Sequence, residues 1–156
     1  MKRTPFLAIV IAVLLAVLGS LALAHQDKYT LTVPGGLAFS EFRGYEAWQV
    51  VSISHDGDLL AAILANPTMI DAYGAGVPGN GKPFPDGAKM AKIHWMANKN
   101  EDQPGGPIVP GALHDVDFMV KDSKRFADSG GWGWAQFDYD PATDTFRPAD
   151  TSSSPP

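Results

Sequence analysis

The residues best suited to chemistry lie on segments in which polar and apolar side chains alternate. In residues 89–97, Lys92 and His94 fall on one face, and Ile93 and Trp95 fall on the other, because successive side chains of a strand point to opposite faces. Such a lysine either lies along a solvated face with its amine in water, or sits desolvated in a pocket as a nucleophile. Both interpretations are open from the residues alone.

A second alternating segment carries two carboxylates. Asp115 and Asp117 alternate with Val116, Phe118 and Val120, which is the pattern of a half-buried strand. If the polar face lines a cavity, an aspartate on it can act as a proton acceptor. The alternative is an ordinary wet face of the sheet.

Aromatic side chains gather further along the chain. Within residues 132–139, Trp132 and Trp134 share one face, while Ala135 and Phe137 share the other. Such residues usually form core or dimer interface, and the alternative is that they line a planar cofactor.

The four histidines are far apart in the sequence and show no metal-ligand spacing. They are His25, His55, His94 and His114. Each is interpreted first as a surface or hydrogen-bonded residue. A minor alternative is a copper site at His25, which would become the N-terminus of a processed chain.

Composition excludes several classes of function. The sequence contains no cysteine, which rules out disulfides, thiolate metal sites and cysteine nucleophiles within these residues. Glycine-rich segments are present, but phosphate-binding and serine-hydrolase motifs are absent. The net charge of −5 makes nucleic acid and anionic membrane surfaces poor candidates as partners.

The first 24 residues have the order of a secretory signal peptide. Lys2 and Arg3 precede the apolar run 6–18, and Ala22-Leu23-Ala24 supplies a cleavage pattern. We therefore expect export to the periplasm, with an N-terminal membrane anchor as the alternative. Removal of 1–24 would leave 10 basic and 17 acidic residues, a charge of −7.

The remaining chain predicts an α+β fold with a mainly antiparallel sheet of about five strands and short helices. An irregular segment at 25–41 precedes a domain at 42–140, and 141–156 is expected to be a flexible linker. A turn-rich loop is expected at 98–111. The expected strands are 48–54, 59–65, 89–97, 115–120 and 132–139, and the expected helices are 68–73, begun by Pro67 after an Asn66 cap, and 124–127.

Three segments resemble the cytochrome P-460 family. They are Phe84-Pro-Asp-Gly87 before the strand with Lys92, the run Val120-Lys-Asp-Ser-Lys-Arg-Phe-Ala127, and the strand Trp132 to Phe137. The resemblance covers about 42–140. It implies an exported bacterial protein, usually a homodimer, that carries a c-type haem. It also implies redox chemistry on, or binding of, small nitrogen species such as hydroxylamine or nitric oxide, with a periplasmic electron carrier as a partner.

The resemblance also implies roles for single residues. Lys92 matches the strand lysine that enzyme members cross-link to the haem edge, and Asp117 matches their distal carboxylate, although aspartate is shorter than the usual glutamate. Together with Lys92, the residues His94, Trp132 and Trp134 are the expected haem contacts. Ala61 stands where some enzyme members have an arginine, which makes ligand binding or electron transfer as well supported as turnover.

The largest departure from the family is the missing haem-attachment motif. Family members bind haem through Cys-x-x-Cys-His, and this sequence has no cysteine. Two explanations are open: the sequence is a fragment that ends before the motif, or the protein is a haem-less relative. The leading function is an exported cytochrome P-460-like haem protein, and the alternative is a haem-less small-ligand-binding or structural module on the same scaffold.

Overall fold

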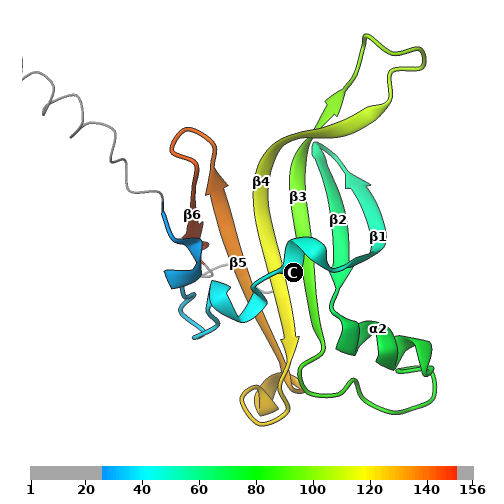
Figure 1. Ribbon diagram of the computed structural model, residues 1–156, viewed down its shortest axis with the longest axis vertical. Helices are drawn as coiled ribbons and strands as arrows, with labels where there is room; N and C mark the ends of the chain where they lie inside the picture. The colour runs from blue at the N-terminus through cyan, green and yellow to red at the C-terminus, as the bar shows by residue number, and fades with distance from the viewer. Residues whose placement is uncertain (1–25, 151–156) are drawn as a thin grey trace, which may run out of the picture.

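A single antiparallel sheet organises the chain, in which each strand pairs with the next strand in the sequence. Residues 26–150 are described by this computed structural model (Figure 1), so the predicted signal peptide and the copper site at His25 lie outside the described residues. The six strands, in sheet order, are β1 (Gln49–Asp56), β2 (Leu59–Ala65), β3 (Lys89–Lys99), β4 (Ile108–Lys121), β5 (Trp132–Asp140) and β6 (Thr145–Pro148). The predicted α+β class with a mainly antiparallel sheet is confirmed, with six strands where about five were expected.

The helices are short, as the many turn-forming residues predict. The helix α2 (Pro67–Gly74) begins as expected, because the Asn66 side chain accepts a hydrogen bond from the Met69 backbone N–H and Pro67 occupies the first turn. The described residues also form four 3-10 helices, η1 (Lys28–Thr30), η2 (Phe39–Phe42), η3 (Tyr45–Ala47) and η4 (Ala127–Ser129). No helix in residues 26–150 is long and apolar enough to span a membrane.

Three local predictions differ from the structure. Residues 124–126 of the helix expected at 124–127 form a turn, in which the Asp122 side chain accepts from the backbone N–H groups of Lys124 and Arg125, and the 3-10 helix η4 begins only at Ala127. The turn-rich loop expected at 98–111 is present but shorter, at 100–107, because its first two residues belong to β3 and its last four to β4. The expected linker at 141–156 contains β6, whose Phe146 is buried. Only four residues long, β6 shows too few alternations to reveal a strand period.

The core lies on one face of the sheet, beneath the N-terminal segment. In Figure 1 this segment, with η2 and η3, crosses in front of the sheet. Phe39 is fully buried, and its ring contacts Phe118 of β4, Phe137 of β5 and Phe146 of β6. The segment predicted as irregular at 25–41 therefore supplies the centre of the core.

On the opposite face of the sheet, within residues 26–150, α2 covers one end. There α2 packs through Met69 against Ala65 of β2 and Ala88. The rest of this face carries the polar residues of β3 and β4 that the sequence singled out. It is therefore the face on which a functional site can form.

Candidate functional site

Lys92 and Asp117 lie directly opposite each other on neighbouring strands. The register pairs Lys92 of β3 with Asp117 of β4, and on the outer sides of these strands Ile63 of β2 pairs with Lys92 and Gln136 of β5 with Asp117. Residues directly opposite on antiparallel strands point to the same face. The strand alternation that the sequence predicts therefore brings the two polar residues together.

Both residues line a shallow cavity of about 250 Å³ with mainly apolar walls. The apolar residues of its lining are Ile63, Met90, Phe118, Met119 and Trp134. The amine and the carboxylate are the charged groups of this lining, so the cavity combines an apolar surface with one cation and one potential anion.

A second polar pair lies one step along the same two strands. His94 is paired with Asp115 in the register, and its Nδ1 lies 2.5 Å from Asp115 Oδ1. Both residues are buried, with 8% and 4% of their surfaces exposed. Ala61 of β2 pairs with His94 on the other side and is also buried.

A β-bulge adds a second imidazole to this cluster. The register passes from the pair His94 and Asp115 to the pair Trp95 and Leu113, so His114 is an extra residue on β4. Bulges of this kind redirect a side chain. The Nδ1 of the half-exposed His114 lies 2.5 Å from Asp115 Oδ2. His94 and His114, which are far apart in the sequence, therefore meet at Asp115, where both are hydrogen-bonded residues.

The two aspartates differ in their electrostatics. Burial opposes ionisation of Asp115, but the hydrogen bonds and positive charge of His94 and His114 outweigh it and hold the pKa of Asp115 below its usual value. Burial, followed by the charge of Asp115, raises the pKa of Asp117 to about 6, against the opposing effects of His94 and Lys92. Asp117 therefore changes its charge near neutral pH and Asp115 does not.

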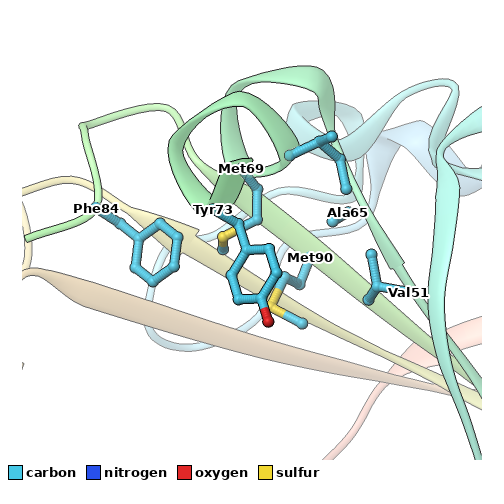
Figure 2. A pocket seen from close by; sticks show the side chains of 7 residues that line it. Val51, Ala65, Met69, Tyr73, Phe84 and Met90 are labelled. Carbon is cyan, nitrogen blue, oxygen red and sulfur yellow. The ribbon is translucent and has the colours of Figure 1, made fainter. Parts of the chain in front are cut away.

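A larger apolar cavity adjoins this face beside α2. It measures about 340 Å³ and shares Met90 with the cavity at Lys92. Figure 2 shows Met69 and Tyr73 of α2 and Phe84 of the following loop around the same space as Met90. The two cavities thus form neighbouring parts of one largely apolar surface.

The sequence-predicted residues do not all meet at one place. Lys92, Asp117 and Trp134 line the same cavity, and His94 lies next to Lys92 on the same face but in the Asp115 cluster. Trp132 does not line this cavity but packs, with Phe84 and Met90, against the apolar cluster beside α2, and the Lys121 amine lies over its ring. The contact of His114 with Asp115 was not predicted from the sequence, because no residue pattern predicts the β-bulge that creates it.

Comparison with known protein families identifies the family of this chain. A family model described as Cytochrome P460 matches residues 42–154, more than half of the 156-residue chain. No curated protein matches the chain.

Proposed function

Because this chain belongs to the cytochrome P460 family, we propose that the sheet face carrying Lys92 and Asp117 contacts a haem in an exported protein. The proposed activity is redox chemistry on, or binding of, a small nitrogen species such as hydroxylamine or nitric oxide. The observation that carries the proposal is the direct pairing of Lys92 with Asp117 in one cavity with apolar walls.

The residues of this face fit a haem in one respect and not in another. The apolar side chains of Met90, Met119 and Trp134 suit a flat, largely apolar ring, and the adjoining cavity beside α2 extends that surface. The sequence has no cysteine, so these residues supply no thioether bond to a c-type haem. The fit is therefore to contact with the haem edge, without covalent attachment through sulfur.

Lys92 and Asp117 would then have different tasks. A bound haem would supply the electron transfer at its iron. The Lys92 amine would hold or tether the haem edge, and Asp117 would accept a proton from the ligand. With a pKa of about 6, Asp117 is mostly ionised at neutral pH and close to the optimum for exchanging a proton there.

The wider setting is proposed on the same basis. The order of charged, apolar and small residues in 1–24 supports export to the periplasm. A homodimer and a periplasmic electron carrier are the partners that membership of the family suggests. The acidic composition supports neither nucleic acid nor an anionic membrane as a partner.

A haem-less binding module is the second candidate function. It is favoured by the absence of cysteine in the sequence and by the single amine in an apolar cavity, which suits a small acidic ligand. In that case Lys92 would be the charge that the ligand neutralises, and no redox chemistry would follow.

Addition of hemin to the purified protein separates the two functions. Haem contact predicts a saturable absorption band, and Lys92→Met should change its position or intensity. Lys82→Met removes an exposed lysine outside this face and should leave the spectrum unchanged. Protein that binds no hemin would overturn the haem proposal and leave the binding module. An unchanged spectrum in Lys92→Met would refute the role of Lys92.

A further inference from the structure

Three carboxylates gather beside His94, and Lys92 lies directly opposite one of them, Asp117. Asp115 and Asp117 lie two residues apart on the same face of β4, and Asp138 of β5 is paired with Asp115 in the register. In the described part of the chain the partners of Asp115 are two imidazoles, and Asp138 has Arg147 at 3.5 Å. Carboxylates this close and this buried are usually paired or bound to a cation.

We propose that His94, Asp115 and Asp117 form a binding site for a divalent metal ion of the zinc class, with His114 as a further ligand on the exposed side. One ligand atom from each of the first three residues lies within 4.8 Å of the others. This proposal goes beyond the haem function and does not depend on it. A bound ion would occupy the Asp117 carboxylate, so Asp117 would accept a proton only while the ion site is empty.

The distances within the cluster suit an ion after a small adjustment. His94 Nδ1 lies 2.5 Å from Asp115 Oδ1 and 3.8 Å from Asp117 Oδ2. Ligands at about 2.1 Å from a tetrahedral ion lie about 3.4 Å from one another, a value between these two separations. Small side-chain rotations that move His94 Nδ1 and Asp115 Oδ1 about 1 Å further apart would therefore open the space for the ion.

The ligand types indicate which ions the site would prefer. Imidazole nitrogen suits zinc, copper, iron and nickel, whereas sets of oxygen ligands alone suit magnesium and calcium. One or two imidazoles with two carboxylates therefore favour a transition-metal ion over the alkaline earths. Three protein ligands, with the fourth position taken by His114 or water, is an arrangement typical of zinc.

The strands hold these ligands in place without help from flexible loops. His94 is in the middle of β3, and Asp115 and Asp117 are in the second half of β4, where each is fixed by ladder pairing on both sides. The bulge adds His114 from the same strand. A site on paired strands is already ordered before the ion arrives, which reduces the entropy lost on binding.

Zinc binding can be measured directly on the protein without haem. Isothermal titration calorimetry of the protein, purified without a polyhistidine tag, should show one zinc ion per chain. Magnesium under the same conditions should show no comparable binding. Asp115→Asn and His94→Gln should each weaken zinc binding by at least about 100-fold, since even loss of an outer partner costs about 10- to 100-fold.

Matched controls remove histidines elsewhere. His55 is exposed on β1 and projects from the opposite face of the sheet, because its pair Leu60 precedes Ala61 of the His94 row. His55→Gln should bind zinc as the unaltered protein does, and so should His25→Gln. His114→Gln is a milder variant at a half-exposed residue, expected to weaken binding by about 10-fold with the fold intact by circular dichroism.

Several outcomes would overturn the proposal. The first is that the unaltered protein binds no zinc. The second is that the folded His94→Gln and His114→Gln variants bind zinc as tightly as the unaltered protein does. The third is that zinc binding is lost in His25→Gln alone. Cobalt in place of zinc adds an independent readout, because visible bands of a tetrahedral ion should vanish in His94→Gln. Failure of hemin to bind would leave this result untouched, so the two proposals fail separately.

Discussion

Replacement of Asp117 by asparagine should stabilise the protein at high pH and not at low pH. Burial and the neighbouring Asp115 raise the pKa of Asp117 from 3.8 to about 6. The folded state therefore binds a proton that the unfolded state releases between these two values. The stability from protonated Asp117 is fully present below pH 3.8 and is lost as the pH rises through about 6.

The size of this effect follows from the two pKa values. A rise from 3.8 to about 6 corresponds to about 3 kcal/mol at 1.36 kcal/mol for each pH unit. Asparagine has nearly the shape of the protonated acid and carries no charge at any pH. At pH 8, Asp117→Asn should therefore raise the free energy of unfolding by up to about 3 kcal/mol, and at pH 4 the difference should approach zero.

Urea unfolding, followed by tryptophan fluorescence at each pH from 4 to 8, measures this difference. Asp128→Asn serves as the control, because it removes an exposed carboxylate of η4 that lies outside the cluster. If Asp117→Asn changes stability equally at pH 4 and pH 8, or lowers it at pH 8, the electrostatic account of the cluster is refuted.

Three further substitutions test the packing and the turn that position the site. Gly133→Ala places a Cβ atom 2.4 Å from the Phe126 ring and should lower the stability measured by thermal unfolding by about 1–3 kcal/mol. In the control Gly35→Ala, the added Cβ meets nothing within 4 Å, and equal losses of stability in the two variants would contradict the contact with Phe126. Asn66→Ala removes the acceptor for the backbone N–H groups of Met69 and Lys89 and should cost about 1–2 kcal/mol in urea unfolding, whereas Asn66→Asp should retain most of the stability. Phe39→Ala should cost about 3–5 kcal/mol in the same assay, and a loss below about 1 kcal/mol would show that the N-terminal segment is not part of the cooperative core.

The sequence predicted the strands of the site because their side chains alternate without interruption. Residues 59–65 form β2 with the predicted bounds, and the polar face of β3 meets the polar face of β4 as the two alternations imply. Cross-strand register is a different matter. Pairing Lys92 with Asp117 depends on the length of the loop and the position of the bulge, which no local pattern in the sequence gives.

Other features depend on contacts made at long range. Phe39 belongs to a segment without periodicity, and only its ring contacts with three distant strands make it the centre of the core. The burial of Phe146 could not be predicted from the sequence either, because the four-residue strand β6 is defined by its pairing with β5 and not by a pattern of its own. His114 joins the cluster through backbone irregularity, so residue type and spacing alone could not place it.

The burial of Phe39 beneath β4, β5 and β6 has a consequence for the order of folding. The strands pair with their sequence neighbours, so β1 to β4 can pair through local contacts before β5 and β6 join the sheet. The core cannot close at that stage, since Gln26 exchanges hydrogen bonds with the backbone of Phe146, 120 residues away. The hairpin of β3 and β4, which carries Lys92 and Asp117, should therefore form before the core closes. Until β6 pairs with β5, the apolar face of the partly formed sheet stays exposed to solvent.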